Sequence, residues 1–223
     1  MRDIIIIGAG PAGSGLAHAL ARRGWDVLLV ERDRLPRHKV CGEFLSPESR
    51  GSLRALGLLN AVAALGPAPI EGAAITAPSE RALRVDLPGA AWGVSRYALD
   101  AALAAAATQA GAEVRMGVSA ASYHVGADGM ATVRLRGVGG AEEVRARTVV
   151  VACGRHPVRG LRARPARVPE RTAVGVKCHV AGAEAGCAVE LFLFEGGYAG
   201  LAPVEGGLVN LCLLASRAAL RRA

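Results

Sequence analysis

The chain has 223 residues, of which 52% are hydrophobic and 4% aromatic, and its formal net charge is +8. The length and hydrophobic content predict a globular protein with one sizeable core or two small domains, and they exclude a disordered chain. The positive charge comes almost entirely from arginines scattered among small residues. Because aromatic residues are too few for a base-stacking surface, nucleic acid is not an expected partner.

No apolar run approaches the roughly 20 residues that a membrane-spanning helix needs, although the positive charge leaves peripheral contact with a membrane surface open. The N-terminal segment runs into a glycine motif without a small-residue cleavage site, so a signal peptide is not expected and a cytoplasmic location is predicted. The five cysteines contain no C-x-x-C pair, which argues against a disulfide framework or a zinc site. No oligomeric state is predicted.

The start of the chain predicts a strand, a helix and a second strand. Residues 3–7 and 27–30 are short β-branched runs of the kind that form buried parallel strands. The segment 11–23 between them is predicted to be a helix that stops at Gly24.

A glycine motif lies at the turn between the first strand and the helix. Gly8, Gly10 and Gly13 form G-x-G-x-x-G, which permits a tight turn, a close approach of a pyrophosphate and close packing of helix on strand. The helix N-terminus would direct its N–H groups at the phosphates. Glu31 lies where a carboxylate accepts a hydrogen bond from a ribose 2′-hydroxyl and repels the 2′-phosphate of NADP. Together these features predict a bound dinucleotide.

The following residues break the regular alternation of strands and helices. A helix is predicted over 47–56, a β-hairpin over 71–89, and a second helix from the N-cap Ser95 to Gln109. This break argues against a simple NAD-dependent dehydrogenase, which remains an alternative.

A strand over 113–116 precedes a β-meander. Residues 121–147 are predicted to form three alternating strands joined by short Gly/Asp turns, which feed a buried strand over 148–152. A β-meander in place of a crossover helix is typical of flavoproteins with two dinucleotide-binding folds.

The chain after Arg171 is rich in strand patterns and is predicted to form an antiparallel sheet on the substrate side. Phe192, Phe194 and Tyr198 either line an apolar pocket there or pack in the core.

These motifs together resemble the FAD-dependent oxidoreductases that include geranylgeranyl reductases and para-hydroxybenzoate-hydroxylase-like monooxygenases. The resemblance is carried by GAGPAG at 8–13, Glu31-Arg32, KVCGEF at 39–44, SRYALD at 95–100, VVVACGRH at 149–156 and GYAGLAPVEGGLVNLCL at 197–213.

The resemblance implies an α/β fold in which a Rossmann-like FAD-binding domain, with a parallel sheet and a β-meander crossover, is joined to an antiparallel-sheet substrate domain of α+β type. The implied boundaries are 1–70 with 93–165 for the FAD-binding domain, 71–92 with 166–215 for the substrate-side domain, and 216–223 for the start of a truncated helical segment.

The resemblance also implies FAD as cofactor, NAD(P)H as electron donor and a set of FAD-binding residues. The expected residues are Gly8, Gly10, Pro11, Ala12 and Gly13 at the pyrophosphate, Glu31 and Arg32 at the adenosine ribose, Val118 beside the adenine, Arg96 toward the phosphate or ribityl side, and Gly154. In the loop along the outer face of the flavin, Lys39 and Arg37 would pair with phosphate oxygens, and Cys41 and Gly42 would lie near the flavin ring. An ordinary i,i+4 ion pair with Asp100 on a helix surface is the alternative for Arg96.

Cys41 and Glu43 are the candidate catalytic residues. In geranylgeranyl-reductase-like members a cysteine in this loop lies near substrate and flavin, so Cys41 either protonates a reduced double bond or is a small residue in a tight loop. Glu43 is either a general acid or a charge close to a helix.

Two departures from the family pattern affect the expected function. Cys153-Gly154 stands where members often carry Asp-Gly, which bears on NAD(P)H contact, and the chain ends before the family's downstream Gly-Asp segment. The expected function is alkene reduction or flavin monooxygenation of an apolar, isoprenoid-like or polyketide-like molecule. The alternative is a truncated FAD-binding remnant or one part of a split enzyme.

The remaining candidates are weaker. Cys178, His179 and Cys187 resemble metal ligands in composition, but strand alternation puts Cys178 and His179 on opposite faces, so shared ligation is not expected. His156 either faces the site or is a solvated loop residue, and the solvated position is the expected one.

Overall fold

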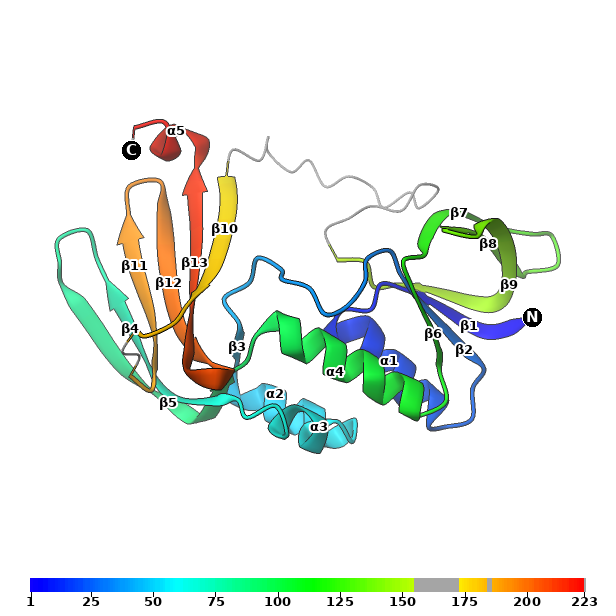
Figure 1. The fold of residues 1–223 in the computed structure, drawn as a ribbon, viewed down its shortest axis with the longest axis horizontal. Helices are drawn as coiled ribbons and strands as arrows, with labels where there is room; N and C mark the ends of the chain where they lie inside the picture. Colours follow the sequence, from blue (N-terminus) through cyan, green and yellow to red (C-terminus); the bar gives the residue numbers. More distant parts are fainter. Residues whose placement is uncertain (155–172, 184–185, 223) are drawn as a thin grey trace. The chain divides into compact units, whose positions relative to one another are not determined.

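The computed structural model describes residues 1–154, 173–183 and 186–222. The chain divides into two compact units (Figure 1). The first unit contains Met1–Arg37 and Leu99–Arg167, and the second contains His38–Ala98 and Val168–Ala223. Each unit is built on its own β-sheet.

The first unit has a six-stranded sheet with the order β6-β2-β1-β9-β8-β7. Its strands are β1 (Arg2–Ile7), β2 (Val27–Glu31), β6 (Glu113–Met116), β7 (Ser119–Val125), β8 (Ala131–Gly137) and β9 (Gly140–Val151). The strands β6, β2, β1 and β9 are parallel, whereas β7, β8 and β9 form an antiparallel meander. The predicted parallel sheet with a meander crossover is confirmed.

Both faces of β1 are buried, which explains its uninterrupted run of isoleucines. Ile4 and Ile6 pack with helix α1 (Pro11–Ala21) and with residues of helix α4 (Arg96–Gln109). Ile5 and Ile7 pack on the other face against β8. Burial of each isoleucine side chain contributes about 1.5–3 kcal/mol to stability. The strand is therefore a main anchor for the glycine turn that follows it.

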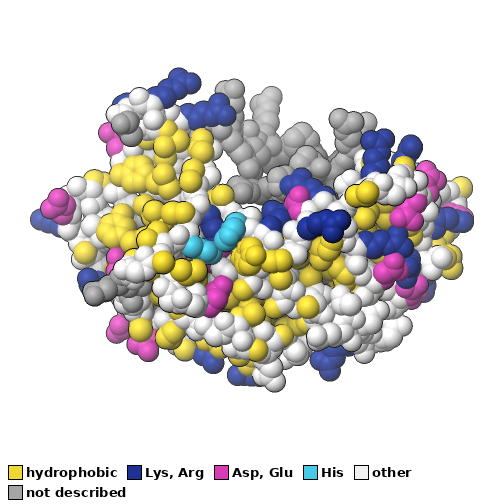
Figure 2. Space-filling model, viewed as in Figure 1, with side chains coloured by type: hydrophobic (Ala, Val, Ile, Leu, Met, Phe, Trp, Pro, Cys, Tyr) yellow, Lys and Arg dark blue, Asp and Glu magenta, His cyan; other side chains and the backbone are white. Residues whose placement is uncertain are grey.

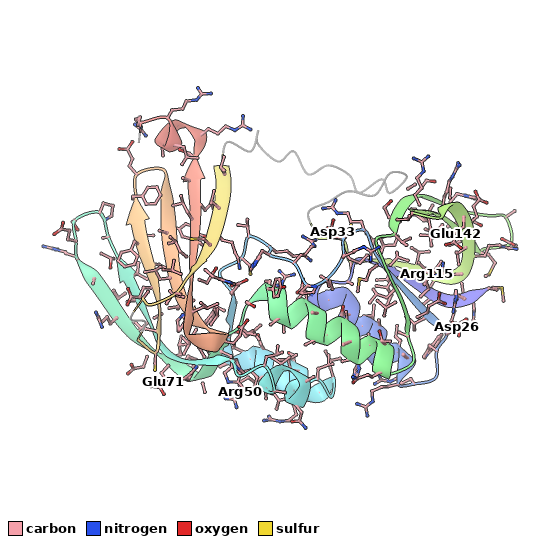
Figure 3. All side chains as sticks on the ribbon, viewed as in Figure 1. Asp26, Asp33, Arg50, Glu71, Arg115 and Glu142 are labelled. Carbon is pink, nitrogen blue, oxygen red and sulfur yellow. The ribbon has the colours of Figure 1, made fainter. Side chains whose placement is uncertain are left out.

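The meander curls back over the edge of this sheet. Arg115 on β6 donates a hydrogen bond to Glu142 on β9 at 2.7 Å, although the two strands are not neighbours in the sheet (Figure 3). Arg115 also donates to Glu113 at 2.6 Å, which lowers the pKa of Glu113 below its ordinary value.

Two predicted boundaries in this unit were wrong. The third meander strand and the strand predicted over 148–152 form one strand, β9, because no turn residue interrupts residues 141–151. Residues 148–151, which were predicted to be buried, are only partly buried. Helix α1 ends at Ala21 rather than at Arg23, because its last turn tightens: the N–H of Arg23 bonds to Leu20 and that of Gly24 to Ala21.

The second unit has a seven-stranded sheet with the order β10-β13-β12-β11-β4-β5-β3. Its strands are β3 (Phe44–Leu45), β4 (Ala68–Thr76), β5 (Ala82–Gly93), β10 (Ala173–Val180), β11 (Ala188–Phe194), β12 (Gly197–Val204) and β13 (Leu208–Ser216). Helices α2 (Pro47–Ala55), α3 (Leu59–Ala63) and α5 (Arg217–Leu220) complete the unit, with a 3-10 turn at Glu205–Gly207. All strand pairs are antiparallel except β4 and β11, which pair in parallel.

The sheet of the second unit is partly uncovered. Ile70, Ala91 and Ala202 form one cluster of buried hydrophobic residues there. Phe192 on β11 and Tyr198 on β12 keep 37% and 38% of their surface exposed, so neither is a core residue. Figure 2 shows hydrophobic side chains gathered over β11, β12 and β13. No described helix is long and apolar enough to span a membrane.

Candidate functional site

The glycine turn after β1 cannot accept larger residues. A Cβ atom on Gly8, whose φ is +106°, would lie 2.7 Å from the carbonyl oxygen of Ala152, and a Cβ on Gly13 would lie 1.9 Å from the carbonyl oxygen of Gly8. Both distances are far below normal contact, so the backbones of β1, α1 and the end of β9 approach one another only because these residues are glycines.

The N-terminus of α1 is open to an anion. Gly10 is its N-cap and supplies no side-chain cap, Pro11 has no N–H, and no acidic residue lies in the first turn. The first hydrogen bond within the helix runs from the N–H of Ser14 to the carbonyl of Gly10 at 2.9 Å. The N–H groups of Ala12 and Gly13 therefore precede the helical hydrogen-bond ladder, where they and the helix dipole favour phosphate oxygens.

Glu31 connects three segments at the end of β2. Its side chain is buried, and it accepts hydrogen bonds from the N–H groups of Ala9 at 2.9 Å and Asp33 at 3.1 Å. Its carbonyl accepts from the N–H of Val118 at 2.9 Å, so the structure brings together the predicted ribose and adenine residues. Arg37 also forms an ion pair with Oε1 of Glu31 at 3.9 Å, which is longer than a hydrogen bond. Because a carboxylate has about four acceptor positions, Glu31 keeps acceptor capacity for the hydroxyl groups of a ribose.

Two other predicted cofactor residues of the first unit, Arg32 and Gly154, follow the ends of strands β2 and β9. Arg32 is exposed and pairs with Asp33 at 3.3 Å, and Gly154 follows β9 with φ of +66°. Arg37 donates to Asp33 at 2.9 Å, while its Nε is buried without a hydrogen-bond partner among the described residues. An unpartnered buried donor beside Glu31 is consistent with a polar group of a ligand at this point.

The loop with the candidate catalytic residues belongs to the second unit, as does Lys39. Cys41 is half-buried, and its Sγ lies 3.4 Å from the N–H of Glu43, which has a φ of +58°. The side-chain amide of Asn210 donates to the carbonyl of Cys41 at 3.0 Å, which fixes the loop to β13. Gly42 would have no atom within 4 Å of a Cβ, so its backbone faces open space.

Glu43 is fully buried and has three partners. Its Oε1 accepts hydrogen bonds from the N–H of Arg96 at 2.7 Å and from the Nζ of Lys177, and its Oε2 lies 2.6 Å from Nε2 of His179. The carboxylate therefore meets the N-terminus of α4 and a buried cation at once. Asp100, four residues after Arg96 on α4, is fully buried.

A cavity of about 540 Å³ lies in the second unit. It is lined by His38, Ser95, Tyr97, Lys177, Cys178, His179, Glu205 and Leu208. The ring of His38 lies 4.8 Å from that of Tyr97 and 5.2 Å from that of His179, centroid to centroid. Glu205 is held by the N–H of Ser95 at 2.7 Å and by its hydroxyl group.

Sequence reasoning missed most of this cavity. Lys177 and His179 lie on one face of β10, where both contact Glu43. The signal in the sequence was a lysine and a histidine at positions i and i+2 of a predicted strand, because such residues point to the same side of the sheet. Cys178, between them on β10, is exposed and also borders the cavity. The described residues contain no group of three or more His, Cys, Asp or Glu that could hold a metal ion. His156 lies outside the described residues.

Comparisons with known proteins agree with the geometry of the first unit. A family model described as an FAD binding domain matches residues 1–186. Digeranylgeranylglycerophospholipid reductase 2 of Methanopyrus kandleri is 35% identical over 161 residues, which are 68% of this chain and 37% of that protein. The flavin-dependent halogenase armH3 of Armillaria mellea is 35% identical over 132 residues, which are 56% of this chain and 26% of that protein.

Solved structures share the fold over nearly the whole chain. The myxobacterial chondrochloren halogenase CndH superposes with a TM-score of 0.86 and 26% identity, and the match covers 99% of this chain and 54% of that one. A geranylgeranyl bacteriochlorophyll reductase-like protein from Thermoplasma acidophilum superposes with a TM-score of 0.76 and 22% identity, over 96% of this chain and 56% of that one. The chain thus spans about half the length of these structures and a smaller part of the two sequence relatives.

Proposed function

The chain belongs to the family of FAD-binding domains, and we propose that it holds FAD through its first unit and acts in an FAD-dependent oxidoreductase on an apolar small molecule. The observation that carries the proposal is the glycine turn between β1 and α1, followed by the buried carboxylate of Glu31. The two glycines leave room for a pyrophosphate at an uncapped helix N-terminus, and Glu31 keeps free acceptor positions.

The residues proposed to hold FAD divide by the part of the cofactor they would bind. Gly8, Gly10, Pro11, Ala12 and Gly13 would hold the pyrophosphate, Glu31 and Arg32 the adenosine ribose, and the backbone of Val118 and Gly154 the remaining edges of the site. Lys39 is proposed for phosphate oxygens, Arg96 for the phosphate or ribityl side, and Cys41 and Gly42 for the outer face of the flavin. Bound FAD would supply hydride transfer or oxygen activation, and the protein would bind it, orient it and exclude water.

The second unit is proposed as the substrate side. The half-exposed Phe192 and Tyr198 support an apolar, isoprenoid-like or polyketide-like substrate. NAD(P)H is the proposed electron donor. Between alkene reduction and oxygenation, the half-buried thiol of Cys41 in an accessible loop favours reduction, because a thiol there can protonate carbon.

FAD binding is tested by the visible spectrum of the purified chain, chromatography of the released cofactor and titration of refolded apoprotein with FAD. We expect a yellow protein that releases FAD. Glu31→Gln should weaken FAD binding about 10-fold or more, since it replaces a charged acceptor worth about 1.5–3 kcal/mol per hydrogen bond. Glu142→Gln, on the exposed meander of the same unit, should bind FAD normally. A folded chain that takes up no FAD would overturn the proposal.

Turnover is tested separately. With NADPH and geranylgeranyl diphosphate in the absence of oxygen, a reductase would yield a product heavier by two hydrogens in the mass spectrum. Coupled consumption of NADPH and oxygen with an aromatic substrate would instead support monooxygenation. A chain that binds FAD but does neither would support the alternative of a non-catalytic FAD-binding remnant or one part of a split enzyme.

A further inference from the structure

We propose that Cys41 and Cys212 are a redox-sensitive pair, in which hydrogen peroxide oxidises the thiol of Cys41 and Cys212 then closes a reversible disulfide with it. All five cysteines of the chain are free thiols. Where cellular thiols are kept reduced, the disulfides that do form are usually transient and redox-sensing. The modification goes beyond the proposed function, and only its effect on turnover rests on that function.

The loop with the candidate catalytic residues lies against one face of β10 and β13. A Cβ on Gly175 of β10 would lie 3.0 Å from a side-chain methyl group of Val40, and Lys177 pairs with Glu43. In the register of the two strands, Lys177 stands opposite Cys212. Paired residues of neighbouring strands point to the same face of a sheet. The cysteine of the loop therefore lies on the face to which the side chain of Cys212 points.

The two backbone groups of Cys41 are held by side chains of β13. The amide of Asn210 donates to the carbonyl oxygen of Cys41 at 3.0 Å. Burial raises the pKa of the Cys212 thiol, and a hydrogen bond from the backbone of Cys41 partly opposes this rise. Asn210 and Cys212 are at positions i and i+2, so their side chains share a face and their Cα atoms are about 6.8 Å apart. Cys41 thus spans the gap between them, with its own side chain beside Cys212.

The two thiols differ as the two steps of disulfide formation require. Cys41 is half-buried, so a small oxidant reaches it. Cys212 is only 9% exposed, which protects it from the oxidant and leaves it to react with a partner inside the protein. The ammonium group of Lys177 counteracts the effect of burial on the pKa of Cys212 and so favours the thiolate that attacks in the second step.

The chemistry needs one equivalent of hydrogen peroxide. The thiolate sulfur of Cys41 attacks the peroxide, the O–O bond breaks, and a sulfenic acid and hydroxide form. The thiolate of Cys212 then attacks the sulfur of the sulfenic acid, so that the S–S bond forms and a second hydroxide leaves. The two hydroxides take up the two thiol protons. Two thiols are oxidised to a disulfide, and the peroxide is reduced to two molecules of water.

The disulfide ties the loop to β13 and removes the S–H group of Cys41. Since the proposed reduction uses this thiol as a proton donor, oxidation stops turnover and a thiol reductant restores it. The bond also closes a long segment of the chain, which constrains the unfolded state. The second unit therefore becomes more resistant to urea when it is oxidised.

The test is peptide mapping of the full chain after oxidation. Reduced protein at low concentration is treated with hydrogen peroxide, alkylated with iodoacetamide and digested after glutamates without reductant. This cleavage gives the peptide 32–43 with Cys41 and the peptide 206–223 with Cys212, and neither contains another cysteine. We expect these two peptides to be joined, and dithiothreitol to release them.

Two variants separate a specific pair from general thiol oxidation. Cys212→Ala should abolish the joined peptides, and dimedone should then trap the sulfenic acid of Cys41. Cys187→Ser, at an exposed cysteine, should leave the yield of joined peptides unchanged. Oxidation should raise the urea midpoint of the wild type and not that of Cys212→Ala.

Three results would overturn the proposal. These are oxidation of Cys41 without joined peptides, joined peptides that form no faster in the folded chain than in urea, and equal amounts of linkage to the exposed cysteines. None of these readouts needs bound FAD, so failure here and failure of FAD binding are seen separately.

Discussion

Replacement of Gly13 by alanine tests whether close packing of α1 on β1 sets both stability and FAD binding. The added Cβ would lie 1.9 Å from the carbonyl oxygen of Gly8 and 3.2 Å from the Cβ of Ala152, whereas an ordinary contact begins near 3.4 Å. The obstacle at 1.9 Å is backbone, so the helix must move away from the strand. Overpacking of this kind costs about 1–3 kcal/mol, and we expect the upper end because no side chain can rotate aside.

The chain offers a selective probe of this effect. It has two tryptophans, Trp25 in the first unit and Trp92 in the second, so in a Trp92→Phe background fluorescence reports the unit that contains Gly13. Urea titration should show unfolding of that unit at lower urea with an unchanged m-value. FAD titration should show weaker binding, because the shifted helix N-terminus no longer meets the pyrophosphate in the same place.

Gly51→Ala is the matched control for Gly13→Ala. Gly51 also lies inside a helix, α2, but a Cβ there would have no atom within 4 Å. Its replacement should stabilise the second unit by about 0.5–1 kcal/mol, as expected for glycine to alanine in a helix. If Gly13→Ala were as stable as wild type and bound FAD normally, the argument that this glycine sets the spacing of helix and strand would be refuted.

Three further predictions follow from buried or paired groups. Glu43→Gln should destabilise the second unit by about 3–5 kcal/mol, because it leaves Lys177 as an unpaired buried cation. Urea titration monitored by Trp fluorescence measures this change. A loss of less than about 1 kcal/mol would contradict a buried ion pair. The hydrogen bond from Arg115 lowers the pKa of Glu113 in the folded protein. The stabilisation by this carboxylate is therefore fully present above its pKa in the unfolded chain, and it is lost as the pH falls through its lower pKa in the folded protein. Urea midpoints measured against pH should differ between Glu113→Gln and wild type at neutral pH and converge in acid. Burial raises the pKa of the Cys212 thiol, so iodoacetamide should label Cys212 more slowly than the exposed cysteines in peptide mass spectra, and equal rates would show that β13 opens readily.

The elements of the first unit were predictable because their causes are local. The isoleucine run of β1, the glycines after it and Glu31 at the end of β2 lie within the first 31 residues, and each has a direct structural consequence in the turn. Ser95 likewise marks the start of α4, where its hydroxyl accepts from the N–H of Ala98 at 3.0 Å. Propensity and spacing suffice when the partners are close in sequence.

Strand order in the second unit could not be predicted in the same way. The parallel pairing of β4 with β11 joins Gly72 to Ala188, and no local pattern in either strand specifies that partner. The hairpin prediction was correct for β4 and β5 because a short turn links them. Pairing between strands that are distant in the sequence depends on the packing of the whole sheet, and the pattern of one strand does not identify its partner.

The role of Glu43 shows the same limit at the level of one side chain. From its position next to Cys41 and Gly42, Glu43 was interpreted as a loop residue or a charge close to a helix. It does lie at the start of helix α4, because its side chain accepts a hydrogen bond from the N–H of Arg96. Its other partners, Lys177 and His179, are 134 and 136 positions away along the chain. Burial of a carboxylate without hydrogen-bond or ion-pair partners would cost several kcal/mol of folding free energy. The fold must therefore bring these partners to Glu43 from distant parts of the sequence. The loop sequence therefore identified one polar residue of this cluster, and β10, far away in the sequence, supplies the two side chains that contact it.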